Sequence, residues 1–141
     1  MFNKKYEDRL RCWNEFRSHL ETIEDPIQET IDLYNLCPLV SIQVDPYDQD
    51  TWLDPWQLLY ENTYCKFAVI LGIAYTLQLT ERFSQTPFEI HICTDKTNSE
   101  VKYLLYVANK VIGYNRTRAV DTSELSTTIT IEKIYQLPTL Q

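Results

Sequence analysis

The stretch YCKFAVILGIAYTLQLTERF, from Tyr64 to Phe83, decides the fold because it holds the longest charge-free apolar run of the chain. That run, Phe67 to Leu79, has 13 residues, whereas a membrane-spanning helix needs about 20. The stretch therefore predicts a buried central helix and no membrane span. Gly72 lies in its middle and costs a helix about 1 kcal/mol relative to alanine, so we expect another element to pack closely against it.

The sequence before this stretch predicts further helices. Apolar residues recur there at helical spacing: Phe2, Tyr6, Leu10, Trp13, Phe16, Leu20 and Ile23. The charged residues between them, Arg9 included, predict a solvated helix face. The pairs Asp25-Pro26 and Asp54-Pro55 each combine an N-cap with a proline at the first helical position, so each predicts the start of a short helix. Alternation over residues 39–44 predicts a strand.

The last third of the chain changes to the period of two that is typical of strands. Residues 88–93 alternate between apolar and polar, and residues 101–107 repeat the alternation. Residues 108–110 predict a hairpin turn between strands. Residues 127–137 predict a last strand, in which the apolar phase breaks and indicates a bulge near Glu132 and Lys133.

Helices followed by an antiparallel meander predict an α+β fold. We expect N-terminal helices and a buried central helix packed on a C-terminal antiparallel sheet of about four strands. A chain of 141 residues has the usual length of one domain. We therefore expect a single domain over residues 1–141, with a helical part over 1–84 and a sheet part over 85–141.

Composition excludes several classes of function. The 13 basic and 20 acidic residues give a net charge of −7, which argues against a nucleic-acid partner because such proteins need a basic face. The four cysteines form no CxxC pair, so neither a zinc ribbon nor a redox dithiol is indicated. Gly72 and Gly113 are the only glycines. They form no phosphate-binding or dinucleotide motif, and we expect no cofactor.

Cys65 is the catalytic candidate because it falls in the first turn of the predicted central helix, where the helix dipole favours a thiolate. His91 and Asp95 follow it, and papain-like and transglutaminase-like cysteine enzymes are laid out in this order. The gap of 26 residues from Cys65 to His91 is short for such enzymes. A free cysteine is also a common buried residue. A cysteine hydrolase or transferase is therefore the alternative function.

Glu89, His91 and Cys93 fall on one face of a predicted strand, and all three residue types bind zinc. Side chains two residues apart on a strand lie about 7 Å apart, so three from one strand rarely converge on one ion. We therefore predict no metal site, and a zinc site at these three residues is the weaker interpretation.

Acidic and aromatic residues gather between Asp45 and Tyr64, where no basic residue occurs. Aromatic anchors with charged neighbours are typical of protein interfaces. The stretch predicts a binding surface made of Tyr47, Asp48, Asp50, Trp52, Trp56 and Tyr60. In an alternative interpretation the tryptophans fill the core and the aspartates cap turns. A calcium loop is a third interpretation, although the glycine that such loops need is missing.

The block WLDPWQLL, residues 52–59, together with residues 61–65 and 71–77, resembles small uncharacterised proteins encoded by contractile-tailed phages of marine cyanobacteria. The resemblance carries no activity. It implies a virus-encoded protein in the cytoplasm of an infected bacterium or in the virion, and the first residues contain no apolar segment typical of a signal peptide. We therefore expect a small acidic protein–protein interaction or assembly protein that binds a protein partner or a second copy of itself.

Overall fold

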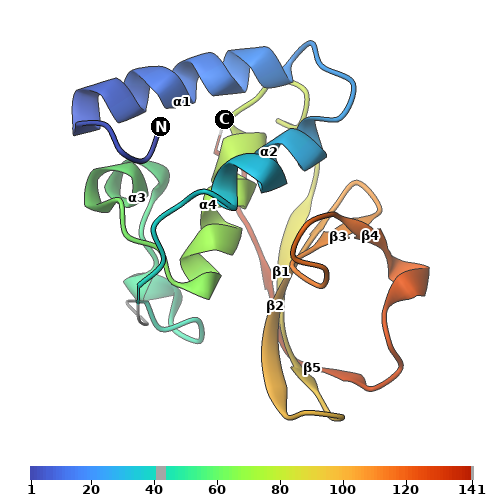
Figure 1. Ribbon diagram of the computed structural model, residues 1–141. Coiled ribbons are helices and arrows are strands. Elements are labelled where there is room, and N and C mark those ends of the chain that lie inside the picture. Colours follow the sequence, from blue (N-terminus) through green and yellow to red (C-terminus); the bar gives the residue numbers. More distant parts are fainter. Residues whose placement is uncertain (41–43, 141) are drawn as a thin grey trace.

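The structure, a computed structural model, describes residues 1–40 and 44–140. Its helices are α1 (Tyr6–Leu20), α2 (Pro26–Tyr34), α3 (Pro55–Glu61) and α4 (Lys66–Gln78), with the short 3-10 helices η1 (Gln49–Thr51) and η2 (Thr122–Glu124). Its strands are β1 (Phe88–Asp95), β2 (Glu100–Val107), β3 (Lys110–Ile112), β4 (Val120–Asp121) and β5 (Ile129–Gln136). In Figure 1 the four α-helices lie on one side of the sheet. The predicted α+β fold is confirmed.

The sheet has five antiparallel strands in the order β4-β3-β2-β1-β5, one more than the predicted number of about four. The additional strand β4 is two residues long, which is too short to leave an alternating pattern in the sequence. Strands β1 to β3 follow the predicted meander, and the unpredicted β4 continues it. Strand β5 departs from it, because it returns to the far edge of the sheet and pairs with β1.

Two local predictions in the sheet are confirmed. The turn between β2 and β3 places Ala108 and Asn109 in the left-handed region, with φ values of 47° and 66°, as a two-residue hairpin requires. In β5, Lys133 pairs with Ile92 whereas Ile131 pairs with the next residue of β1. One residue of β5, Glu132, is therefore left over as the bulge.

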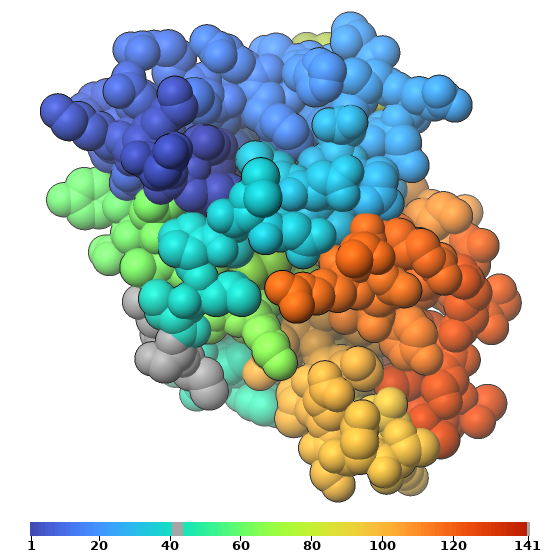
Figure 2. Space-filling model, in the orientation of Figure 1, coloured from blue at the N-terminus to red at the C-terminus, as the bar shows by residue number. Residues whose placement is uncertain are grey.

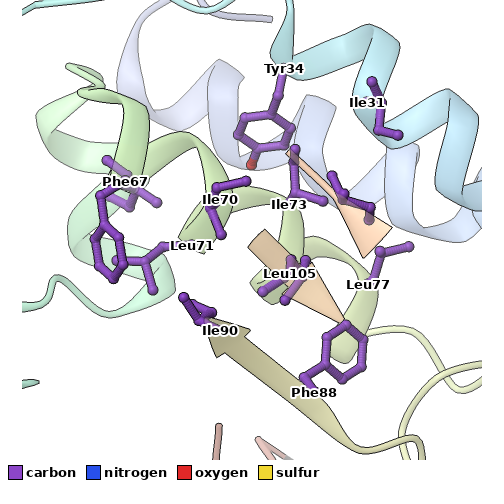
Figure 3. Packing of buried hydrophobic residues seen from close by; sticks show 14 of the residues in the cluster. Ile31, Tyr34, Phe67, Ile70, Leu71, Ile73, Leu77, Phe88, Ile90 and Leu105 are labelled. Atoms are coloured by element: carbon purple, nitrogen blue, oxygen red, sulfur yellow. The ribbon is translucent and has the colours of Figure 1, made fainter. Parts of the chain in front are cut away.

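Helix α4 lies at the centre of the core and joins the helical part to the sheet. Figure 3 shows side chains of α2 and α4 facing those of β1 and β2, with Tyr34, Ile70, Leu71, Ile90 and Leu105 among them. These residues belong to one cluster of buried apolar side chains. A second, smaller cluster includes Cys93 and Leu104, which face away from the helices. The chain between β3 and β5 packs on it.

Helix α4 is shorter than predicted, since it begins at Lys66 and ends at Gln78, whereas the prediction ran from Tyr64 to Phe83. The hydroxyl of Thr80 donates to the carbonyl of Leu77 at 2.6 Å and closes the last turn. The carboxylate of Glu21, just after α1, then accepts the backbone N–H groups of Glu81 and Arg82 at 2.8 and 3.1 Å. A tertiary contact with α1 thus ends the helix, and no local signal in the sequence could reveal it.

Gly72 lets α2 approach α4 closely, as predicted. A Cβ atom at this position would lie 2.4 Å from the ring of Tyr34. The hydroxyl of Tyr34 reaches Thr76 Oγ1 at 3.0 Å, and Trp13 Nε1 donates to the same oxygen at 2.9 Å. Three helices therefore meet at one buried hydroxyl, which fixes α1 and α2 on α4.

Arg9 corrects the prediction of a solvated face, because its side chain is buried. Its guanidinium donates to the carbonyls of Leu59 and Tyr60, each at 3.0 Å. These carbonyls end α3, and a cation is favourable at a helix C-terminus. Arg9 therefore ties α3 to α1, a role that a lone charge in a helical pattern does not reveal.

The predicted strand over residues 39–44 lies partly outside the described residues, which omit 41–43. In the described part, Leu39 forms a single parallel bridge with Tyr64. Among the described helices, none combines the length and the apolar character that crossing a bilayer requires.

Candidate functional site: an aromatic face on α3

Helix α3 begins and ends at strong local signals. The carboxylate of Asp54 accepts the N–H of Gln57 at 2.8 Å, and the Gln57 side chain accepts the N–H of Asp54 at 3.0 Å. This capping box starts the helix with Pro55 in the first turn. Asn62 ends it in the left-handed region with a φ of 52°. The predicted helix start at Asp54-Pro55 is confirmed.

Trp56 and Tyr60 are the exposed aromatic residues of this helix, and we call them the α3 face. Their exposed fractions are 48% and 63%. They lie one turn apart, so they point to the same side of α3. Trp56 meets the buried Trp13 edge-on with ring centres 5.4 Å apart, and Tyr60 meets Tyr6 at 5.1 Å. Each ring thus has one edge supported by α1 while the rest remains in solvent.

Trp52 lies differently from the other predicted binding residues, because it is half-buried. Its ring packs between Phe67 of α4 and Tyr135 of β5, with ring centres 5.0 and 4.9 Å away. Its indole N–H donates to the carbonyl of Asp45 at 3.2 Å. Trp52 therefore joins the loop before α3 to the core, and it is not part of the α3 face.

The remaining predicted binding residues lie in the loop before α3. Tyr47 is 57% exposed. The carboxylate of Asp48 accepts the N–H of Asp50 at 3.1 Å and caps η1. Asp50 is exposed. Figure 1 places this loop and α3 on the same side of the molecule. The predicted surface thus divides into an aromatic face on α3 and an acidic loop with one exposed tyrosine.

The structure does not bring Cys65, His91 and Asp95 together. Cys65 was predicted in the first turn of the central helix, but it is the N-cap of α4 and is buried in the cluster between helices and sheet. In β1, Ile90 points into that cluster, so its neighbour His91 points to the opposite face. The carboxylate of Asp95 accepts the N–H of Thr97 and the hydroxyl of Thr128, at 3.0 and 2.9 Å. Hydrogen bonds from the hydroxyl of Thr97, then from its N–H and from Thr128, lower the pKa of Asp95 and give it a role in the turn after β1.

The weaker metal candidates share one face of the sheet, as alternation predicted. His91 Nε2 lies 3.1 Å from a carboxylate oxygen of Glu89, and its ring stacks on Tyr106 with centres 3.9 Å apart. Cys93 is buried, and burial raises the pKa of its thiol, which disfavours the thiolate that binds metal. Within residues 1–40 and 44–140, no group of three or more His, Cys, Asp or Glu side chains is arranged to hold a metal ion. This holds also for the aspartates before α3, which the calcium-loop interpretation would use.

No family model matches this chain, and no curated protein matches its sequence. Any function must therefore be argued from the geometry of the described residues.

Proposed function

We propose that the protein is a small acidic protein–protein interaction or assembly protein that docks a partner on the α3 face. The exposure of Trp56 and Tyr60 carries the proposal. Large aromatic side chains dominate the binding energy of protein interfaces when a partner buries them. Both rings are braced by α1, so little side-chain freedom is lost when a partner covers them.

Charge specifies the kind of partner. Asp54 precedes α3, Glu61 is its last residue, and the loop before the helix adds Asp48 and Asp50. No basic residue occurs between Asp45 and Tyr64. Acidic groups in the segment that carries these aromatic residues favour a partner with basic groups beside an apolar pocket, and they discourage nucleic acid. The partner is a protein of that kind or a basic region of a second copy.

The experiment compares wild-type protein with the double variant Trp56→Ser/Tyr60→Ser. Sedimentation equilibrium over a wide concentration range tests self-association. Capture from a lysate of the natural host, followed by titration calorimetry with the purified partner, tests a second protein. Ile131→Ser is the matched control, because Ile131 is 49% exposed and lies on β5, an edge strand of the sheet, and not on α3.

We expect the double variant to weaken binding at least 30-fold, the effect of losing an interface hot spot of about 2 kcal/mol. The control should bind like wild type, and salt should weaken the wild-type complex. Equal binding by all three proteins would overturn the proposal. The proposal would also be overturned if the wild-type protein stays monomeric in sedimentation and captures no protein that the double variant fails to capture.

The alternative of a cysteine hydrolase or transferase gains no support from the arrangement, because Cys65 and His91 face opposite sides of β1. The phage origin stays a prediction.

A further inference from the structure

A groove of about 370 Å³ opens between the helices and the sheet, and no residue of α3 lines it. Its walls come from the C-terminal end of α2, the first half of α4, the start of β2 and the chain after β3. In Figure 2 the surface is hollowed between the green start of α4, the orange chain after β3 and the gold hairpin of β1 and β2. Its volume lies near the lower end of the range for small-molecule sites, roughly 300–1,000 Å³.

Aliphatic side chains from both layers line the groove, among them Ile31, Val69, Ile70, Ile73 and Ile112. Three tyrosines, Tyr34, Tyr103 and Tyr114, line it as well. Val69 is only half-buried on α4, so part of an apolar side chain faces the open groove. Such a lining favours a ligand with an apolar part.

The sheet leaves one edge open along this groove. Strand β2 pairs with β1 along its whole length, but β3 pairs only with its last part, from Leu105 to Val107. The chain then leaves the sheet at Gly113, whose φ is 105° and where a Cβ would lie 2.3 Å from the carbonyl oxygen of Tyr103. In the described part of the chain, the start of β2 therefore has no strand beside it on the groove side.

The charge at the groove is opposite to that of the whole chain. Its lining includes Lys66, Lys102 and Arg116 but one acidic residue, Glu100, whereas the chain carries −7. Lys102 is 3.6 Å from Glu100. Within the described residues, neither Lys66 nor Arg116 forms an ion pair. Two exposed cations that line an apolar groove and form no ion pair favour an anion there in an otherwise acidic protein.

We infer that the groove binds a small amphipathic anion, a carboxylate on an unbranched aliphatic chain. The chain lies against the isoleucines of α2 and α4, and the carboxylate lies near Lys66 and Arg116. Apolar contact supplies most of the affinity, and the cations select the charged form of the ligand. This inference does not depend on the α3 face, which lies outside the groove.

Titration calorimetry with decanoate, below the concentration at which it forms micelles, tests the inference. Acetate offers the charge without the chain, and decanol offers the chain without the charge. The variant Lys66→Met/Arg116→Met removes the cations while keeping aliphatic bulk. Val69→Trp fills the groove from a half-buried position. The control Lys5→Met removes an exposed cation just before α1.

We expect one decanoate per protein, with acetate and decanol binding at least tenfold more weakly. Loss of the two cations should weaken decanoate binding about tenfold, Val69→Trp should abolish it, and Lys5→Met should leave it unchanged. Circular dichroism checks that each variant is folded. Equal affinity for decanol and decanoate, or unchanged binding by the folded cation variant, would overturn the inference. Absence of decanoate binding by the wild-type protein would overturn it as well.

Discussion

The buried hydroxyl of Thr76 gives the sharpest test of how this fold is held together. It donates to the carbonyl of Gly72 at 2.7 Å. A hydroxyl has one hydrogen, so its oxygen must accept from both Trp13 Nε1 and the Tyr34 hydroxyl. All three side chains are almost fully buried. Thr76→Val keeps the shape and removes the acceptor that these two buried donors share.

Each orphaned donor costs about 1–3 kcal/mol, so Thr76→Val should lower the free energy of unfolding by about 2–6 kcal/mol. That is a large share of the roughly 5–15 kcal/mol that stabilises an ordinary domain. Urea unfolding followed by tryptophan fluorescence measures it. Thr30→Val is the matched control, because the buried Thr30 hydroxyl donates only to the carbonyl of Pro26, at 2.8 Å. It leaves no donor unpaired and should cost less than about 1 kcal/mol.

A double-mutant cycle separates this cause from a packing defect. Tyr34→Phe removes one of the two donors in advance, so Thr76→Val should cost about 1–3 kcal/mol less in that background. Thr76→Ser keeps the hydroxyl and should lose only the contribution of one methyl group, about 0.8 kcal/mol. The reasoning is refuted if Thr76→Val and Thr30→Val cost the same, or if the cycle shows no coupling to Tyr34.

Three further predictions concern stability. Trp52→Ala should cost about 2–4 kcal/mol because the ring fills a site between α4 and β5, whereas Trp56→Ala should cost less than about 1.5 kcal/mol; thermal unfolding of both tests the contrast. Gly72→Ala should destabilise by about 1–3 kcal/mol despite the better helix propensity of alanine, because the new Cβ overlaps the ring of Tyr34; a stability gain in urea unfolding would contradict this. Burial, and then the nearby Asp54 carboxylate, raise the pKa of Tyr75 to about 12. Its contribution to stability is therefore complete below the unfolded pKa of about 10 and is lost as pH rises through 12, so Tyr75→Phe should flatten the fall in unfolding free energy measured between pH 10 and 12.

The sequence predicted those parts of the fold that depend on local signals. The helix start at Asp54-Pro55, the hairpin turn at residues 108–110 and the bulge near Glu132 are each encoded within a few residues, and each is confirmed. Features made by distant contacts were missed. The early end of α4 depends on Glu21, and the burial of Arg9 depends on the carbonyls of α3. Neither partner lies near enough in sequence to form a pattern.

The candidate sites follow the same division. Alternation correctly placed Glu89, His91 and Cys93 on one face of β1. Side chains at every second residue of one strand lie too far apart to bind the same ion. The acidic, aromatic stretch was found from composition, yet composition could not tell that Trp52 enters the core while Trp56 does not. The groove was not predicted at all. Its cations come from the start of α4, from β2 and from the chain after β3, which meet only after folding.

The two proposed sites share one support, and this determines how their tests must be read. Trp56 packs against Trp13, and the indole N–H of Trp13 donates a hydrogen bond to Thr76. Thr76 is also hydrogen-bonded to Tyr34, which lines the groove. A variant that loosens this network disturbs both surfaces without touching either. The α3-face variant and the cation variant of the groove change surface residues and leave this network in place. The α3-face variant should thus bind decanoate like wild type, and the cation variant should keep its affinity for the protein partner. A variant that loses both partner binding and decanoate binding has lost the network of Trp13, Thr76 and Tyr34. Only a variant that loses one kind of binding and keeps the other assigns that binding to its site.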